Sequence, residues 1–276
     1  MHVPLHSVDR QAWREHGVSA GKRTIPEETA VALTYDGGTY AVMMATPQDL
    51  ADFAVGFSLS EGLVQSPNEI ASLDIVDLKD GIELRMWLAP ERAALISERR
   101  RQIAGPTGCG LCGIDSIAEA LRPPKVVPKG GRVSQCEVMS AMRSIAPLQQ
   151  INIETRAVHA AAFWMPSRGI ISLREDVGRH NALDKLHGTL KLAHLSAGHG
   201  MVLLTSRISV EMVQKTAALG APIMVAVSAP TTLAVRMADA AGITLIGVAR
   251  SDGFEVFTHP ERVAADVGAK EMEDVA

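Results

Sequence analysis

The sequence predicts an α/β protein in which a C-terminal domain with a mostly parallel sheet follows a smaller α+β N-terminal domain. Predicted helices over 209–219 and 231–241 end at Gly220 and Gly242, and each leads into an apolar, β-branched run. Glycine ends helices because it accepts the left-handed conformation, and helices that feed apolar strands are typical of βαβ crossovers. With 276 residues, 47% hydrophobic and 21% charged, the chain is long enough for two ordinary globular domains.

Composition sets the expected organisation along the chain. Residues 1–23 are polar and lack periodicity, so we expect a disordered or loosely ordered tail. The N-terminal α+β domain should span 24–105, and the C-terminal α/β domain 134–276. Between them, 106–133 should form a flexible cysteine-containing loop, a short helix and a linker rich in proline and glycine. The N-terminal domain carries little obvious chemistry, which favours a docking or dimerising module.

The N-terminal domain should begin with strands over 30–35 and 39–44, joined by a turn at Asp36-Gly37-Gly38. A helix should start at Thr46 as N-cap with Pro47 in its first turn, and end near Gly62. A second hairpin follows, and then a helix toward the cysteines. The ranges expected for these last elements are 72–78, 81–88 and 90–101.

Farther along, Ser116 and Glu119 fit a capping box for a helix over 114–121, and 122–131 reads as a linker. The remaining helices are expected at 134–146, 181–195, 209–219 and 231–241. The strands are expected at 157–164, 170–173, 201–205, 223–228, 243–249 and 255–258.

Charge and cysteine content exclude several classes. The net charge is −4 and aromatic residues make up 4%, which argues against a nucleic-acid-binding surface. No apolar run reaches the roughly 18 residues of a membrane span, and the N-terminus lacks the apolar core of a signal peptide. Three cysteines do not suggest a disulfide framework. We therefore expect a cytoplasmic protein.

Two of the three cysteines, Cys109 and Cys112, stand among glycines in the segment TGCGLCG. The pair could close into a disulfide, supply two of four zinc ligands, carry sulfur as a persulfide, or be inert. Cys136 and His159 could complete a zinc set, but their spacing matches no familiar zinc motif. Reactivity would depend on the thiolate, which a helix N-terminus and the arginine run 99–101 would favour; that run could equally be a solvated helix face. Flanking glycines argue against an inert, buried pair.

Polar loops follow the predicted strands of the C-terminal domain. The block 174–181 contains His180, and Arg207 and Arg250 each come just after a strand. Hydroxyls, arginines and helix N–H groups at such loops can bind phosphates, although the block could also serve only helix capping and surface charge. No phosphate-binding loop or dinucleotide fingerprint is present. The zinc deaminase signature fails because no glutamate follows His159 and the cysteines precede it.

Five segments in order resemble the formate dehydrogenase accessory sulfurtransferases of the FdhD type, over about residues 28–262. The segments are TPQDLADFAVGFSLSEG (46–62), GCGLCG (108–113), REDVGRHNALDK (174–185), SRISVEMVQK (206–215) and SAPT (228–231). The resemblance implies that Cys109 and Cys112 receive sulfur from a cysteine desulfurase. They would pass it to the molybdenum cofactor, as bis-molybdopterin guanine dinucleotide, for insertion into formate dehydrogenase. It also implies a cytidine-deaminase-like C-terminal fold and a homodimer.

By the same resemblance, the cofactor should contact Val248, Ala249, Arg250, Ser251, Asp252 and Gly253, and a guanine nucleotide should mimic it. Arg207 and His180 complete the predicted cofactor-binding set, and no metal ligands are assigned. The family pattern has an aromatic residue where this chain has Val248, so a different molybdenum enzyme as client stays open. The alternatives are a non-catalytic chaperone that docks the cofactor onto its client enzyme, and a zinc-stabilised module.

Overall fold

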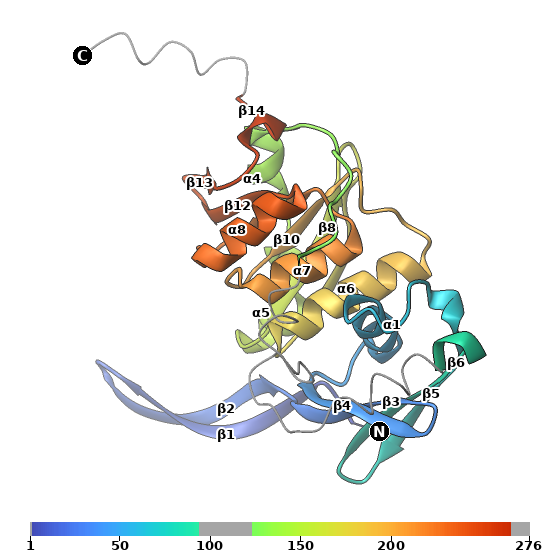
Figure 1. The fold of residues 1–276 in the computed structure, drawn as a ribbon. Helices are drawn as coiled ribbons and strands as arrows, with labels where there is room; N and C mark the ends of the chain where they lie inside the picture. The colour runs from blue at the N-terminus through green and yellow to red at the C-terminus, as the bar shows by residue number, and fades with distance from the viewer. Residues whose placement is uncertain (1, 94–122, 266–276) are drawn as a thin grey trace. The chain divides into compact units, whose positions relative to one another are not determined.

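The computed structural model describes residues 2–93 and 123–265 (Figure 1). The chain divides into two compact units. Unit 1 combines Met1–Arg122 with Gln149–Ala160 and Arg174–Ala193, and unit 2 comprises Pro123–Leu148, Ala161–Leu173 and His194–Ala276. The units interleave along the chain, whereas the sequence predicted contiguous domains. No helix among the described residues is long and apolar enough to cross a membrane.

A four-stranded sheet forms the centre of unit 1, in the order β4-β3-β6-β5. Its strands are β3 (Thr29–Tyr35), β4 (Gly38–Ala45), β5 (Ile70–Leu78) and β6 (Gly81–Leu88). The pairs β3–β4 and β5–β6 are antiparallel, and β3 and β6 run parallel between them. Both predicted hairpins are therefore confirmed. The expected helix over 90–101 and the one over 114–121 lie largely or wholly outside the described residues.

Helix α1 (Leu50–Ser60) completes the core of unit 1 with aromatic side chains. The Phe53 and Phe57 rings meet edge to face with centroids 6.1 Å apart, and Tyr35 meets Tyr40 in the same way at 5.8 Å. The Tyr35 hydroxyl lies 2.7 Å from Ser58 Oγ. Burial raises the pKa of Tyr35, so the phenol stays neutral. The short helix η1 (Pro67–Glu69) connects α1 to β5.

The predicted start of α1 is wrong. Asp49, not Thr46, precedes the helix, in a left-handed conformation with φ 54°, and no side chain caps the first turn. The Thr46 hydroxyl instead accepts a hydrogen bond from Val177 N–H at 3.1 Å. The Thr46-Pro47 sequence is typical of a helix start. Here, however, the Thr46 hydroxyl bonds Val177, which is distant in the sequence, and does not cap the helix.

Helix α6 (Arg179–Leu192) packs against α1 at very short range, because glycine stands at each contact. A Cβ atom added to Gly56 would lie 1.7 Å from Asp184 O, and one added to Gly188 would lie 1.9 Å from Asp52 O. Each glycine therefore lets the backbone of one helix approach the other more closely than any side chain would permit.

Residues predicted to be a loosely ordered tail form a two-stranded hairpin. β1 (Leu5–Arg14) pairs antiparallel with β2 (Gly17–Pro26) without interruption, from Leu5↔Pro26 to Arg14↔Gly17. Near its base, β2 packs against the short helix α5 (Gln150–Thr155), which the sequence analysis missed, and Arg23 donates to Thr155 O at 2.9 Å. The strands escaped prediction because neither has a buried apolar face.

The second sheet has six strands in the order β13-β12-β11-β10-β8-β9. They are β8 (His159–Met165), β9 (Gly169–Asp176), β10 (Met201–Leu204), β11 (Ile223–Ala226), β12 (Thr244–Arg250) and β13 (Gly253–Val256). β10, β11 and β12 are parallel, whereas β8 pairs antiparallel with β10 and β13 with β12. The sheet is thus mixed, and the prediction of parallel pairing holds for the three central strands.

The helices of unit 2 are capped at their ends, and the two glycine ends at Gly220 and Gly242 are those that the sequence predicted. Ser134 and Glu137 form a capping box at α4 (Gln135–Arg143), and Thr231 caps α8 (Thr232–Ala241). Gly220 ends α7 (Val210–Leu219) with φ 86°, and Gly242 ends α8 with φ 72°. The remaining elements are β7 (Val133–Ser134), paired parallel with β14 (Val263–Ala264), and the short helices η2 (Ala146–Leu148) and η3 (Pro260–Arg262).

Replacing Gly56 by alanine should force α1 and α6 apart, since the new methyl group would overlap the Asp184 carbonyl. Overpacking of this kind costs about 1–3 kcal/mol or more. Urea unfolding should show a clear loss of stability in Gly56→Ala. Gly21→Ala is the matched control, because a Cβ atom there meets nothing within 4 Å; equal stability of the two variants would contradict close packing of these helices.

Candidate functional site

The two cysteines at the centre of the sequence prediction, Cys109 and Cys112, lie outside the described residues, as does the arginine run 99–101. Cys136 is on α4 and is exposed. Within the described ranges, no group of three or more His, Cys, Asp and Glu side chains is arranged to hold a metal ion. The chemistry of the cysteine pair therefore stays a prediction.

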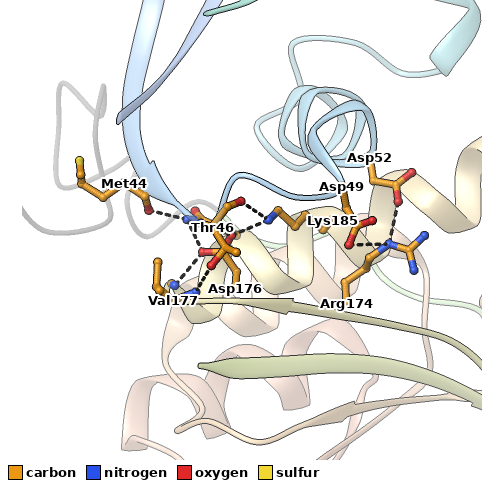
Figure 2. Close-up of polar contacts among 10 residues, drawn as sticks. Met44, Thr46, Asp49, Asp52, Arg174, Asp176, Val177 and Lys185 are labelled. Atoms are coloured by element: carbon orange, nitrogen blue, oxygen red, sulfur yellow. Dashed lines mark hydrogen bonds and ion pairs between the residues drawn. The ribbon is translucent and has the colours of Figure 1, made fainter. Parts of the chain in front are cut away.

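The polar block 174–181 contains a buried carboxylate, Asp176, at the end of β9 (Figure 2). Its Oδ1 atom accepts hydrogen bonds from Gly178 N–H at 2.7 Å and from the Asn181 amide at 3.0 Å. Its Oδ2 atom accepts from Thr46 N–H at 3.0 Å and from Lys185 Nζ at 2.6 Å. Four donors thus surround a carboxylate that no water reaches.

Lys185 is the cationic partner, and both side chains of the pair are 0% exposed. Its Nζ also donates to Thr46 O at 2.9 Å and lies 5.9 Å from the centroid of the Phe53 ring. Asn181 donates to Met44 O at 2.8 Å. The end of β9 and the first turns of α6 are therefore tied to the β4–α1 connection (Figure 2).

Two further charged residues of the block bind helices of unit 1. Arg174 Nε donates to Asp52 Oδ2 at 2.7 Å and lies 3.6 Å from Asp49 Oδ2 (Figure 2). Glu175 accepts hydrogen bonds from the Ile151 and Asn152 N–H groups in the first turn of α5. Burial raises the pKa of Glu175 above its usual value, against the effect of these two donors. Most charges of the block thus hold the fold together.

His180, which the sequence analysis placed in the cofactor-binding set, is the second residue of α6 and belongs to unit 1. It is half-buried. Lys185 was not predicted as a site residue, and Thr46 was predicted only as the N-cap of a helix. The sequence NALDKL places Lys185 among apolar residues of a helix. A lysine on a buried helix face requires a partner of opposite charge, so this pattern could have indicated the buried pair.

The other predicted binding residues lie in unit 2, in the loops that follow β10, β11 and β12. Arg207, just after β10, is exposed. Ile208 forms a parallel bridge with Pro230, and its carbonyl accepts from Thr231 N–H at 3.0 Å. Val248 N–H donates to Ser228 O at 3.3 Å. The loop after β11 therefore links the Arg207 loop to Val248 at one edge of the sheet.

Val248 has a left-handed backbone, with φ 51°. For a β-branched residue this conformation is a genuine outlier, and such strain is concentrated at functional sites. It coincides with a register shift between Gly247 and Arg250 in the β12–β13 pairing. Ala249 is buried, whereas Arg250, Ser251 and Asp252 are exposed and Gly253 begins β13. The predicted segment is thus a strained, protruding turn.

Two buried polar atoms near the start of α7 have no hydrogen-bond partner among the residues that the structure describes. Ser209 stands at the N-cap position of α7 but makes no side-chain cap bond, and its Oγ is unsatisfied. Glu211 Oε2, in the first turn, is also unsatisfied. Unsatisfied buried groups are costly, so this edge of unit 2 offers a hydroxyl and a carboxylate oxygen to a ligand.

A model of the FdhD/NarQ family matches residues 26–264 of the chain. The chain belongs to the FdhD/NarQ family. The match includes Cys109 and Cys112, the buried Asp176–Lys185 pair and the loops at the edge of unit 2, and it begins after most of the β1–β2 hairpin.

Curated relatives agree with this assignment. The sulfur carrier protein FdhD of Agrobacterium fabrum is 49% identical over 260 residues, which are 93% of this chain and 95% of the relative. The proteins of the same name from Brucella abortus and Cupriavidus necator are 47% and 44% identical, over 93% and 94% of this chain and 96% and 91% of the relatives.

A solved structure shares the fold. The crystal structure of a protein described as a formate dehydrogenase accessory protein from Desulfotalea psychrophila superposes with a TM-score of 0.74. The two chains are 24% identical, and the alignment covers 94% of this chain and 99% of the other. The Desulfotalea psychrophila protein therefore shares the mixed α/β fold of this chain despite low sequence identity.

Replacing Lys185 by methionine should destabilise unit 1 by about 3–5 kcal/mol, because it leaves the Asp176 carboxylate buried without its cation. The measurement is the free energy of unfolding in urea. Adding Asp176→Asn to Lys185→Met should restore part of this loss, since the buried charge then disappears. A double variant less stable than Lys185→Met alone would contradict a charge-pair role.

Proposed function

We propose that this protein is a sulfur carrier that accepts sulfur from a cysteine desulfurase and passes it to the molybdenum cofactor. The supporting observation is that the family match over residues 26–264 includes the only CxxC pair of the sequence, Cys109 and Cys112. The relatives named sulfur carrier protein FdhD, which match nearly the full chain, support sulfur as the cargo.

The proposed chemistry uses the two thiols of this chain, a persulfide on the desulfurase as donor and an external dithiol reductant. The Cys109 thiolate attacks the terminal sulfur of the desulfurase persulfide, forms a new S–S bond and releases the desulfurase thiolate, with no net oxidation. Cys112 then attacks the inner sulfur of the Cys109 persulfide. This step forms a Cys109–Cys112 disulfide and releases the sulfur, reduced by two electrons, as hydrosulfide to the acceptor. A cellular dithiol reductant of the thioredoxin class would restore the thiols.

The proposed acceptor is bis-molybdopterin guanine dinucleotide, and the proposed client is formate dehydrogenase, in the cytoplasm of the cell. The client is the enzyme named in the description of the Desulfotalea psychrophila protein. We further propose that the protein acts as a homodimer, with a cytidine-deaminase-like C-terminal fold.

The edge of unit 2 fits such a ligand chemically. Exposed Arg207 and Arg250 supply the charge that phosphate groups require. The unsatisfied Ser209 hydroxyl can donate to a phosphate oxygen, and the unsatisfied Glu211 oxygen can accept from the N–H groups of guanine. The strained turn at Val248 lies beside these loops. When bound, the molybdenum cofactor would be the group that accepts the delivered sulfur.

Incubation of the purified protein with a cysteine desulfurase and cysteine should add one sulfur atom to the peptide that contains Cys109 and Cys112. Mass spectrometry of the alkylated peptides measures the addition. Cys136→Ala is the matched control and should leave it unchanged, because Cys136 lies on a separate helix. Sulfur found on Cys136 alone, or on no peptide, would refute the proposal.

Replacing both thiols distinguishes a sulfur carrier from a chaperone that only docks the cofactor onto its client. A strain that carries Cys109→Ala together with Cys112→Ala should lose formate dehydrogenase activity by at least about a hundredfold, as expected for loss of an essential nucleophile. Full dehydrogenase activity in that strain would favour the chaperone.

Arg207→Ala and Arg250→Ala should each weaken binding of guanosine diphosphate by roughly tenfold, the loss expected for one charge-assisted hydrogen bond. Isothermal titration calorimetry gives the dissociation constants. Arg168→Ala is the matched control, because Arg168 is an exposed arginine in the turn after β8, at the opposite end of the sheet. Equal affinities in all three variants would exclude this edge as the nucleotide site.

A further inference from the structure

The sheet of unit 2 has an edge at which β10, β11 and β12 begin, opposite the edge that carries the candidate site. Residues 125–132, here called the crossing segment, run along this amino edge. Val127 N–H donates to Ala241 O at 2.9 Å, shortly before β12. A Cβ atom on Gly130 would lie 2.4 Å from Pro222, which stands directly before β11. The crossing segment is therefore packed against the starts of the parallel strands.

Arg262 fixes the middle of the crossing segment. Its Nε atom donates to Lys129 O at 2.6 Å, and its Nη1 atom donates to Gly242 O and to Thr244 Oγ1, both at 2.9 Å. Directly after the crossing segment, β7 pairs with β14. The backbone of the segment is thus held in one arrangement. A surface that is already ordered loses little conformational entropy when a partner binds.

Four exposed cations lie along the amino edge. Three belong to the crossing segment, and the fourth is in the turn between β8 and β9, which lies at this edge because β8 runs antiparallel to β10. Within residues 2–93 and 123–265, no carboxylate lies within ion-pair distance of any of the four, so their charge is available to a partner. The four are Lys125, Lys129, Arg132 and Arg168.

The carboxylates of the same edge have other partners. Asp239 Oδ1 and Glu261 Oε1 lie 3.5 and 3.6 Å from the ring nitrogens of His259. Glu137 Oε2 accepts a hydrogen bond from Ser134 N–H at 2.8 Å in the capping box of α4. The amino edge therefore has an excess of positive charge in a chain whose net charge is −4.

An apolar side chain stands among these cations. Val126 is 76% exposed, more than any other large apolar side chain in the described part of unit 2. The next residue, Val127, is buried and anchors the segment. Protein interfaces commonly place an apolar contact within a polar, charged rim. The amino edge thus has the composition of a surface for a protein partner with opposite charge.

We propose that the amino edge of unit 2 is the docking surface for the protein that donates sulfur, and that it binds an acidic surface of that donor. Lys125, Lys129, Arg132 and Arg168 face carboxylates of the donor, and Val126 makes an apolar contact among them. The inference rests on the proposed sulfur-carrier function, but its test separates the two.

The position of the surface along the chain selects the donor as the occupant. The cofactor is proposed to bind at the opposite edge of the sheet, so the amino edge is left for a protein. Positions 109 and 123 are separated by at most roughly 50 Å of fully extended chain. The Cys109 thiol, which must meet the donor's persulfide, is therefore tethered within that distance of the start of the crossing segment.

The rate of sulfur loading tests the docking surface. A cysteine desulfurase that carries a persulfide is mixed with the full chain, and mass spectrometry of the alkylated peptide with Cys109 and Cys112 follows the reaction. Lys129→Glu/Arg168→Glu should lower the second-order rate constant by at least about tenfold, because like charges slow association. Glutathione persulfide, a small donor that needs no docking surface, should load this variant and the wild-type chain at equal rates.

Arg143→Glu/Arg236→Glu is the matched control, because it makes the same change in net charge at exposed arginines of α4 and α8. It should load from the desulfurase at the wild-type rate, and so should Lys129→Arg/Arg168→Lys, which keeps both charges. Equal rates in the two charge-reversal variants would overturn the docking surface and leave the carrier function in place. A Lys129→Glu/Arg168→Glu variant that is slow with both donors would place the loss at the thiols and also overturn the surface. A wild-type chain that the desulfurase does not load would refute the carrier function itself.

Ionic strength gives a test that needs no substitution. Raising the salt concentration from about 0.05 M to about 0.5 M shortens the distance over which exposed charges act. Loading of the wild-type chain from the desulfurase should slow by about tenfold, whereas the rate for Lys129→Glu/Arg168→Glu should change much less. A wild-type rate that does not depend on salt would overturn an electrostatic docking surface.

A photocrosslinker in place of Val126 gives the location. Irradiation of a mixture with the desulfurase should produce a covalent complex of the two proteins, in which the crosslinked desulfurase peptide is rich in aspartate and glutamate. A covalent dimer of this chain, with no desulfurase complex, would overturn the donor as the occupant.

Discussion

Unit 1 depends on one buried carboxylate. Asp176 accepts hydrogen bonds from Thr46, Gly178, Asn181 and Lys185, which come from three stretches of the chain. An ionised pair in a fully buried position has a large desolvation penalty, which only well-placed donors can offset. Because those donors are fixed by backbone and by α6, the first turns of α6, the end of β9 and the β4–α1 connection can adopt few other arrangements. The glycine contacts between α1 and α6 then close the packing.

Local patterns predicted local structure well. The hairpins β3–β4 and β5–β6 followed from turn chemistry and alternation, and the glycine ends of α7 and α8 followed from residue type alone. The predictions failed where contacts with residues distant in the sequence determine the local structure. Thr46 has the sequence of an N-cap, but the strand that ends at Asp176 captures its hydroxyl. The β1–β2 hairpin has no apolar stripe that a periodicity argument could detect, because it buries neither face within its own chain.

Part of the candidate site could be predicted from the order of strands and helices in the sequence. Loops after parallel strands meet at one edge of a sheet, so Arg207 and Arg250 could be assigned to one face from topology, whereas Val248 was predicted only from the family resemblance. The strain at Val248 and the unsatisfied atoms of Ser209 and Glu211 depend on tertiary packing and leave no trace in the sequence. His180 was grouped with these residues because of its loop, yet it belongs to the helix that packs on α1.

The interleaving of the two units has a consequence for biosynthesis. Unit 1 is complete only when α6 has been added to a sheet and helix made from residues 29–88, so its buried lysine reaches its partners late in translation. Until then, the face of α1 that receives α6 has no cover from that helix. A fragment that stops near residue 105 would expose the same apolar face and should be recovered in inclusion bodies. The two units therefore do not correspond to two halves of the chain that a cut near residue 105 would separate.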